Sequence, residues 1–446
     1  METTNITFQK YPAYKDSGVE WLGEIPEHWE ILSNKNIFKL KKNQVGKKSA
    51  DYVLLSLTLK GIIQRIIEDG GKFPAEFDTY QEVKKGDFVF CLFDVEETPR
   101  CVGLSEFEGM ITGAYTVMEV KPKFDNSFLY YFYLNLDSDK RLRPLYTGLR
   151  NTISKDNFFA FKTFIPPLPE QTAIAAFLDD KTAKIDSAIT QKEKMITLLK
   201  ERKQIIIQDL VTGKKVWNTK KNAWTEPTKV KDSGVEWIGE IPEGWIICSI
   251  KYVLSIPITD GPHETPLLLE NGIPFISAES IKNGKIDFSK KRGFISENEH
   301  KRFCKKYKPM KGDIYMVKSG ATTGNIGIVD VDFEFSIWSP LAVFRPNLDI
   351  IINSYLYYFL DSFSFKKGVE LKWSFGTQQN IGMGVLSNLP IAIPTISEQR
   401  AIVAHIETQS AKIDKAIGLQ EQQIEKLKEL KSTLIDSAVT GKIKVS

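Results

Sequence analysis

The sequence offers few residues whose types and spacing suit catalysis. A glycine-rich run from Ser319 to Gly327 lacks the lysine of a phosphate-binding G-x-x-x-x-G-K-[ST] loop, and we interpret it as a turn. The chain contains no Asn-Pro-Pro-Tyr or Asp-Pro-Pro-Tyr segment, which amino-methyl transfer uses, and no G-x-S-x-G nucleophile motif. We therefore predict that the chain contributes no catalytic residues.

The histidines and cysteines do not have the spacing of a metal site either. They are scattered along the chain without a C-x-x-C pair or neighbouring histidine ligands: His28, His263, His300, His405, Cys91, Cys101, Cys248 and Cys304. We predict no bound metal, and cysteines that are reduced and packed inside the protein.

Length and composition indicate an ordinary globular protein of two or more domains. The chain has 446 residues, of which 42% are apolar and 26% charged, and its net charge is only +4. A nucleic-acid partner would therefore bind to local basic patches, because a net charge this small does not give a positive electrostatic potential over the whole surface. The N-terminus lacks signal-peptide features and no run approaches about 20 apolar residues, so we expect a cytoplasmic protein without membrane contact.

Two long helical segments dominate the sequence and are copies of each other. Residues 166–214 match residues 394–442 at a constant offset of 228. Apolar residues step by three and four positions, which is typical of the narrow stripe of a coiled coil. The stripe comprises Ile174, Leu178, Ile185, Ile189, Ile196, Leu199 and Ile206 in the first copy, and Ile402, Ile406, Ile413, Ile417, Ile424, Leu427 and Leu434 in the second.

Three shorter repeats accompany the helices in the same order. Residues 14–31 return at 230–247 (offset 216), Lys-Gly-Asp at 85–87 returns at 311–313 (offset 226), and an aromatic helix from Asn126 returns from Asn353 (offset 227). Collinear repeats with a slowly drifting offset indicate a duplicated module with loop insertions. We interpret residues 14–31, which carry Trp21 and Trp29, as a structural brace; the alternative is a binding site.

The ends of these helices carry capping signals. We expect Gly213 and Gly441 to be left-handed C-caps, Ser397 to be the N-cap of the second long helix, and Asn126 or Ser127 to be the N-cap of the first aromatic helix. About 44 residues would give a rod of roughly 65 Å. The best partner for each apolar stripe is the other copy, and the alternative is a helix of another chain.

These features predict an α+β fold with two globular domains in a pseudo-twofold arrangement, separated by two long antiparallel helices that form a coiled coil. The predicted segments are a first domain at 1–167, a first spacer helix at 168–214, a second domain at 215–395 and a second spacer helix at 396–446. The helices would act as a ruler between two heads that differ in sequence.

The motifs in this order resemble one family. YKDSGVEWLGEIPEHWE and its copy, the helix starts EQTAIAAFL and EQRAIVAHI, and the TAKID and SAKID segments are similar to those of the specificity subunit of type I restriction-modification enzymes. The resemblance spans the whole chain. It implies that each globular part is a target-recognition domain that reads one half of a split, asymmetric site on double-stranded DNA.

The resemblance also implies partners that perform the chemistry. Two modification subunits would methylate adenine with S-adenosylmethionine, and restriction subunits would use ATP and Mg²⁺ for translocation and cleavage. The chain itself would bind no cofactor and would be the non-catalytic recognition subunit. The alternatives are a self-contained DNA methyltransferase or nuclease, against which the missing motifs count, and a repeat-built interaction protein that does not bind DNA.

If DNA is the target, two kinds of side chain should contact it. Cations contact phosphates and orient the protein, whereas Arg, Asn and Gln read base edges. The phosphate candidates are Lys41, Lys42, Lys47, Lys48, Lys290, Lys291, Arg292, Lys305 and Lys306. The base candidates are Arg150, Asn151 and Thr152, which align internally with Gln378, Gln379 and Asn380; Lys318, Thr322 and Thr323 are further candidates, and ordinary surface roles are the alternative for all of them.

Overall fold

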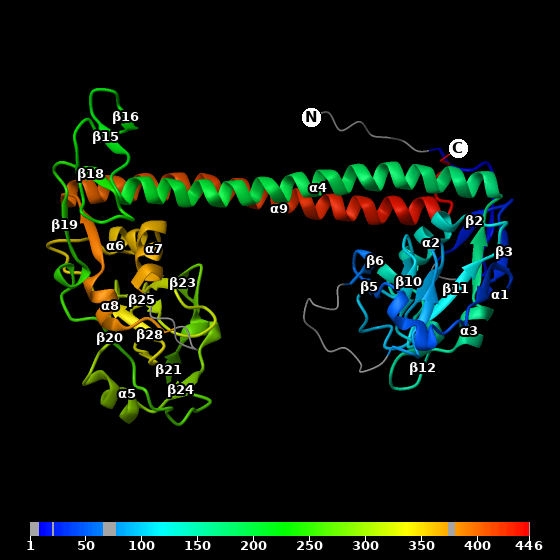
Figure 1. Cartoon of the computed structure of the whole chain (residues 1–446), viewed down its shortest axis with the longest axis horizontal. Helices are drawn as coiled ribbons and strands as arrows, with labels where there is room; N and C mark the ends of the chain where they lie inside the picture. The colour runs from blue at the N-terminus through cyan, green and yellow to red at the C-terminus, as the bar shows by residue number, and fades with distance from the viewer. Residues whose placement is uncertain (1–8, 20–21, 66–76, 373–379, 446) are drawn as a thin grey trace. The chain divides into compact units, whose positions relative to one another are not determined.

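The computed structural model describes residues 9–19, 22–65, 77–372 and 380–445. Trp21, Gln378 and Gln379 lie outside the described residues. The chain forms two compact units (Figure 1): unit 1 comprises residues 1–192 and 421–446, and unit 2 comprises residues 193–420. None of the helices in the described part of the chain is long and apolar enough to cross a membrane.

The two long helices, α4 (Leu168–Val211) and α9 (Ile396–Val439), have 44 residues each and contribute to both units. In unit 1, Lys431 Nζ lies 2.7 Å from a carboxylate oxygen of Asp186, and in unit 2, Lys203 Nζ lies 2.8 Å from Asp414. The residue number on α9 falls as that on α4 rises, so the helices are antiparallel, as predicted. The start of each helix therefore shares a unit with the end of the other.

Unit 1 is built on a four-stranded antiparallel sheet of order β4-β11-β8-β9. Its strands are β1 (Tyr14–Asp16), β2 (Glu24–Pro26), β3 (Glu30–Ser33), β4 (Phe38–Leu40), β5 (Leu55–Thr58), β6 (Gly61–Gln64), β7 (Gln81–Val83), β8 (Phe88–Phe90), β9 (Val102–Leu104), β10 (Gly109–Ile111), β11 (Thr116–Val120), β12 (Tyr146–Thr147), β13 (Thr152–Ile153) and β14 (Lys162–Ile165). Its shorter helices are α1 (Asn34–Ile37), η1 (Gly46–Asp51), α2 (Asn126–Ser138), η3 (Arg143–Leu145) and α3 (Lys155–Ala160).

Unit 2 contains a six-stranded sheet of order β20-β28-β25-β26-β23-β22 and a three-stranded sheet of order β24-β21-β27. Its strands are β15 (Val216–Asn218), β16 (Ala223–Thr225), β17 (Val230–Asp232), β18 (Glu240–Pro242), β19 (Ile246–Ser249), β20 (Thr259–Asp260), β21 (Ile273–Ile276), β22 (Ile281–Lys282), β23 (Gly284–Ile286), β24 (Gly293–Ile295), β25 (Ile314–Val317), β26 (Ile326–Ile328), β27 (Ser336–Ile337), β28 (Leu341–Phe344) and β29 (Pro390–Ile393). Its shorter helices are η4 (Ile250–Val253), η5 (Ala278–Ser280), η6 (Phe288–Lys290), α5 (Glu297–Cys304), α6 (Asn353–Asp361), α7 (Phe363–Lys372) and α8 (Met383–Asn388).

The repeated motifs form the same frame in each unit. The glutamine of each Glu-Gln helix start is buried: the Gln171 side chain donates to Pro166 O at 2.8 Å and accepts from Asp125 N at 2.9 Å. The Gln399 side chain donates to Pro394 O at 3.0 Å and accepts from Ile352 N at 2.9 Å. The repeated glutamine thus fastens the start of each long helix to the residue that precedes each aromatic helix.

Two predicted N-caps were wrong. Asp125, not Asn126 or Ser127, caps α2, because its carboxylate accepts from Phe128 N at 2.9 Å. Before α9, the hydroxyl of Thr395, not Ser397, accepts from Glu398 N at 3.3 Å, while the Glu398 carboxylate accepts from Thr395 N at 3.0 Å. This reciprocal pair is a capping box, which begins the helix earlier than a lone serine cap would.

The predicted glycine C-caps are confirmed, and each docks on a brace. Gly213 and Gly441 have φ of +75° and +74°. A Cβ added at Gly441 would lie 2.3 Å from Cδ of Pro26, and one at Gly213 would lie 2.2 Å from Cδ of Pro242. Trp29 and Trp245, the large residues of the two braces, are buried beside these glycines. The end of each long helix therefore rests on a brace.

We expect Gly441→Ala to destabilise unit 1 by about 2–4 kcal/mol, because a left-handed backbone and a close contact both oppose the added methyl group. Gly213→Ala should have a similar effect in unit 2. Gly418→Ala is the matched control: Gly418 lies within α9, where a Cβ would meet nothing within 4 Å. That change should stabilise by up to about 1 kcal/mol. Urea denaturation measures the free energy of unfolding of the three variants. The prediction is contradicted if Gly418→Ala lowers this free energy as much as the two cap variants do.

Each frame encloses a segment whose ends meet. In unit 1, β3 pairs antiparallel with β14, and Asn34 N donates to Phe161 O at 2.9 Å. In unit 2, β19 pairs antiparallel with β29, and Ile250 N donates to Leu389 O at 2.9 Å. We name residues 34–161 and 250–389 the enclosed segments. The two segments hold different sheets between similar frames.

Candidate nucleic-acid interface

In unit 1, the base candidates Arg150 and Asn151 lie on the turn that joins β12 to β13, and Thr152 begins β13. This turn pairs with the loop after β8: Asp94 N donates to Arg150 O at 2.8 Å and Ile153 N donates to Leu92 O at 2.8 Å. Asp94 and Asn151 have φ of +47° and +43°, a left-handed conformation that Asp and Asn tolerate better than most residues. The backbone of the turn is thus held on both sides of Arg150.

Acidic side chains of the same loop hold the side chains of the turn. Arg150 donates through Nε to Asp94 Oδ1 at 2.9 Å and through Nη2 to Asp94 Oδ2, and Asn151 Nδ2 donates to Glu97 Oε1 at 3.0 Å. Thr152 Oγ1 bonds Arg150 O at 3.4 Å. The bond to Asp94 raises the pKa of the Arg150 guanidinium, and it lowers the pKa of the Asp94 carboxyl. Each group therefore favours the charged form of the other.

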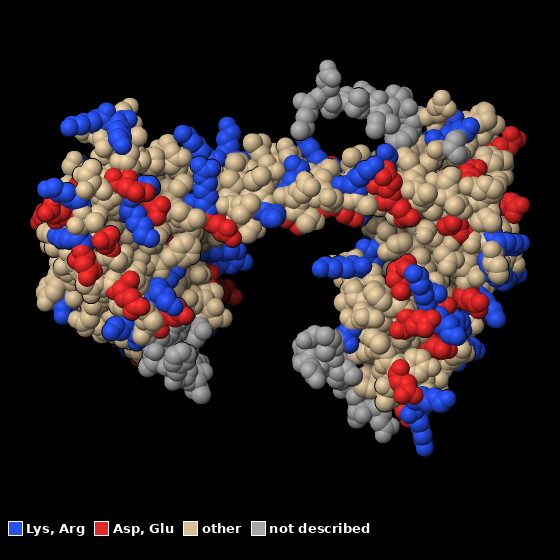
Figure 2. Space-filling view, turned by 45° about the horizontal axis from the view of Figure 1, so that its top comes forward, with Lys and Arg blue, Asp and Glu red and all other residues tan. Residues whose placement is uncertain are grey.

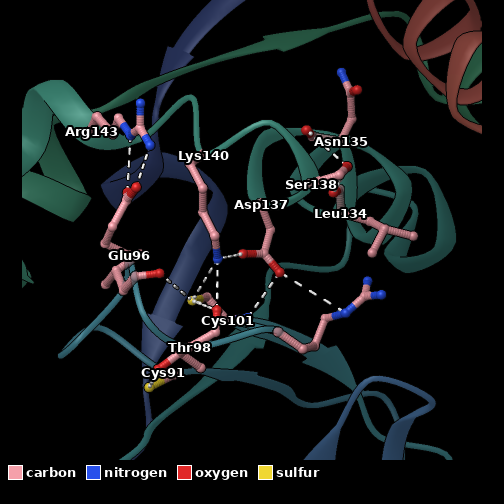
Figure 3. A network of polar contacts seen from close by, with 12 residues as sticks. Cys91, Glu96, Thr98, Cys101, Leu134, Asn135, Asp137, Ser138, Lys140 and Arg143 are labelled. Carbon is pink, nitrogen blue, oxygen red and sulfur yellow. Dashed lines mark hydrogen bonds and ion pairs between the residues drawn. The ribbon is translucent and has the colours of Figure 1, made fainter. Parts of the chain in front are cut away.

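A second arginine is held in the same way. Arg143, in η3, donates through Nε to Glu96 Oε2 at 2.9 Å and through Nη2 to Glu96 Oε1 (Figure 3). Nearby, Lys140 Nζ donates to Asp137 at 3.0 Å and to Thr98 O at 2.7 Å, which ties α2 to the loop. Neither Arg143 nor the acidic residues were predicted from sequence; the only signal for the latter is the cluster Asp94-Val-Glu-Glu97.

The phosphate candidates of unit 1 divide into two kinds. Lys41 is half-buried, and its ammonium lies 2.5 Å from Asp87, so its charge is already paired. The other three side chains are exposed: Lys42, Lys47 and Lys48. Figure 2 shows Lys and Arg interspersed with Asp and Glu on the visible faces of both units. On these faces, positive charge does not form a continuous surface.

In unit 2, the structure brings several candidates around buried Asp260. Lys306 Nζ lies 2.5 Å and Lys318 Nζ 3.0 Å from its carboxylate, and His263 Nε2 lies 3.2 Å away. Burial alone would raise the pKa of Asp260, but hydrogen bonds from the two lysines lower it below its ordinary value. Asp260 is therefore an anion that fixes two cations.

Backbone contacts join this cluster to the remaining candidates of unit 2. Ile381 N donates to Lys318 O at 2.8 Å, and Ser319 forms a β-bridge with Asn380. The adjoining turn carries exposed Thr322, and Thr323, whose hydroxyl donates to Gly320 O at 2.6 Å. Lys318, Asn380 and the threonine turn thus form one loop cluster, which joins candidates that lie about 60 residues apart in sequence.

The other basic candidates of unit 2 lie apart from Asp260. Arg292 stacks on Trp338, with its guanidinium carbon 4.1 Å from the ring centroid, and Lys291 lies 4.8 Å from the ring of Phe294. Lys290 and Lys305 are exposed. Arg292 Nε also lies 3.8 Å from Glu279 Oε1, so this cation has both an aromatic and an acidic neighbour.

The helix stripe is at least partly buried along its length. Ile174, Leu178, Ile185, Ile402, Ile406, Ile413, Ile417, Ile424 and Leu434 are buried, and Ile189, Ile196, Leu199, Ile206 and Leu427 are intermediate. The rings of His405 and Trp224 pack together at a tilt of 37°, with centroids 4.9 Å apart. Among the described residues, no group of three His, Cys, Asp or Glu side chains could hold a metal ion.

Comparison with known proteins relates this architecture to one family. A model of the type I restriction modification DNA specificity domain matches residues 106–197 and 242–429, which together are more than half of the chain. The chain belongs to this family. The two matches fall one in each half, as the duplicated frame does, and each ends within one of the long helices.

Relatives within the specificity family extend over most of the chain. The MjaVIII specificity subunit of Methanocaldococcus jannaschii is 27% identical over 437 residues, which is 94% of each chain. The EcoBI specificity subunit of Escherichia coli is 26% identical over 281 residues, covering 63% of this chain and 58% of that protein. A solved chain from a study of assembly and conformational transition of the type I R-M system has a TM-score of 0.66 at 15% identity, covering 93% of this chain and 98% of that chain, and shares its fold.

Proposed function

We propose that this specificity subunit recognises an asymmetric DNA site of two separated halves, one half per unit. The observation that carries the proposal is that two similar frames enclose different segments, residues 34–161 and 250–389. Two units that have similar frames but different enclosed segments would be suited to bind two half-sites of different sequence. In unit 1 the turn at Arg150, and in unit 2 the loop cluster at Asn380 and Thr322, would contact the bases, whereas Lys318 is buried and would support that cluster from beneath.

The proposed role is recognition and scaffolding in the cytoplasm. Two modification subunits would methylate adenine with S-adenosylmethionine, and restriction subunits would use ATP and Mg²⁺. Lys42, Lys47, Lys48, Lys290 and Lys305 would contact phosphates, and α4 and α9 would set the number of unspecified base pairs between the halves. The exposure of these five lysines supports this reading, because their ammonium groups are accessible to a phosphate backbone.

Mapping of N6-methyladenine in a genome that carries this chain with its modification subunits tests the proposal. We expect a split motif with a fixed spacer. Exchange of residues 34–161 for those of a relative should change one half of the motif, and should leave the other half and the spacer unchanged, because the frames and both long helices are kept. A continuous palindrome, or a change in both halves, would contradict the proposal. Methylation or cleavage by the purified single chain would instead favour a self-contained enzyme.

A further inference from the structure

One end of the Arg150 guanidinium group has no partner among the described residues. Asp94 occupies the edge formed by Nε and Nη2. Among the hydrogen bonds and ion pairs of the described residues, Arg150 makes none through Nη1. The side chain is 71% exposed, so the end formed by Nη1 and Nη2 is open to solvent. Two parallel N–H donors in one plane are what that end offers.

The open end also has a fixed direction. Asp94, which holds the guanidinium, is itself tied to the backbone of Arg150 through its N–H group. The next residue repeats the arrangement, because Val95 N donates to Asn151 O at 3.3 Å and Glu97 accepts from Asn151 Nδ2. Phe93, on the same loop, lies under the guanidinium with its ring centroid 5.9 Å from Cζ. A flexible surface arginine has none of these constraints.

We propose that Arg150 reads a guanine in the half-site of unit 1, and that Asp94 is the residue that positions it. This inference rests on the proposed function and adds a base and a side chain to it. Guanine presents two acceptors, N7 and O6, on its major-groove edge, and they match the two donors of an arginine end-on. Adenine has an amino donor in place of O6 and would face the Nη donors with a like group, so the pair discriminates between the purines.

A phosphate contact is the competing role for the same side chain. A phosphate also accepts two N–H bonds, but it does not need a donor pair whose direction is fixed by a second residue. The exposed Lys42 offers a plain charge of this kind in the same unit. The two roles differ in outcome, because loss of a phosphate contact weakens binding to all sequences, whereas loss of a base contact relaxes one position.

The test uses the full chain assembled with its modification subunits, after the wild-type motif has been mapped. Methylation is measured on DNA duplexes that carry each of the four bases at every position of the unit 1 half-site. In Arg150→Ala and Arg150→Lys, preference for guanine at one position should fall by about 5-fold to 150-fold, with the unit 2 half-site unchanged. Asp94→Asn should relax the same position by a smaller factor, because the arginine remains but is no longer held.

Two control variants make the outcome decisive. Lys42→Ala should weaken methylation of all duplexes equally and leave the motif intact. Arg143→Ala removes a similar arginine–carboxylate pair from the same loop, and should leave the guanine preference unchanged. A uniform loss in Arg150→Ala, or the same relaxed position in Arg143→Ala, would overturn the assignment, the first in favour of a phosphate contact and the second in favour of a structural role. A split motif in wild type would still support the proposed function in either case.

Discussion

Deletion of residues 421–446 should unfold unit 1 while unit 2 stays folded. The last part of α9 supplies four buried residues to the core of unit 1: Leu434, Ile435, Ala438 and Val439. Burial of a Leu, Ile or Val side chain contributes about 1.5–3 kcal/mol, so the three larger residues alone account for about 5–9 kcal/mol. This is comparable with the total free energy of unfolding of a typical domain, about 5–15 kcal/mol.

The deletion also removes hydrogen-bond acceptors from polar side chains of unit 1. Asp436 accepts from Arg141 Nη1 at 2.6 Å and from Asn135 Nδ2 at 3.2 Å, so both lose an acceptor. Tyr14 loses the carbonyl of Gly441, to which its hydroxyl donates at 3.2 Å. These losses fall on α2, on Arg141 shortly after it and on the brace, all of which belong to unit 1 (Figure 1).

Hydrogen exchange followed by peptide mass spectrometry checks this prediction. Peptides from β4, β8, β11 and α2 should lose protection, whereas peptides from β25, β28 and α6 should keep it. A truncation after Lys442 is the control, because it keeps α9 and Gly441 and loses only the partly buried contacts of Ile443 and Val445. Unchanged protection in unit 1 after the long deletion would mean that the C-terminal part of α9 is not part of its core.

The duplicated architecture could be predicted from the sequence, because the two copies can be aligned with each other inside one chain. Two copies of a 44-residue helix with an apolar stripe predict an antiparallel pair, and their glycines predict the left-handed caps at residues 213 and 441. The predicted domain boundaries remain a prediction. The compact units divide the chain within the helices, at residues 192/193 and 420/421, because the end of each helix packs into a core formed by distant sequence.

The N-caps show why local rules were not enough at the helix starts. Asn126 and Ser127 are good capping residues, but Asp125 is held by Gln171 from a distant helix, and this contact fixes where α2 begins. Similarly, Thr395 rather than Ser397 caps α9, because Glu398 completes a capping box with Thr395. Both choices depend on a second residue that a single-position preference ignores.

The candidate interface was predictable in part. The internal alignment indicated the turn at Arg150 from sequence, and the structure gives that turn its acidic partners Asp94 and Glu97. Those partners lie more than 50 residues away in sequence, and a carboxylate on a loop carries no signal of the cation it will meet. Lys41 and Lys306 illustrate the same limit, since both were predicted as phosphate contacts and nothing in the sequence indicated that each would pair with a buried aspartate.

Asp313→Ala should be among the most destabilising single substitutions in unit 2, at about 3–5 kcal/mol. Asp313 belongs to the repeated Lys-Gly-Asp motif and is 1% exposed. Its Oδ1 accepts from Arg345 Nε at 2.7 Å, and its Oδ2 accepts from Arg345 Nη2 and from Met310 N, both at 2.8 Å, and from the hydroxyl of Tyr307. Removal of the carboxylate leaves a half-buried guanidinium and a buried hydroxyl without their acceptor.

The corresponding residue of unit 1 is the natural comparison. Asp87 accepts from Lys84 N at 2.7 Å and from Lys41 Nζ at 2.5 Å, so it repeats the turn but holds a lysine instead of an arginine. Asp87→Ala should cost less than Asp313→Ala, because the lysine ammonium can move on its flexible stem to reach water, whereas Arg345 is also bonded to Lys308 O at 2.7 Å.

A double-mutant cycle separates the ion pair from the turn. Asp313→Leu combined with Arg345→Met should be less destabilising than the sum of the single changes, because two apolar side chains leave no unpaired charge. Chemical denaturation followed through unit 2 measures the four free energies. Strict additivity would show that Asp313 and Arg345 do not stabilise each other, and that Asp313 acts only through its hydrogen bond to the backbone of the turn. The repeated aspartate would then serve to hold the turn before the strand in both units, and its pairing with arginine in one unit and lysine in the other would not affect stability.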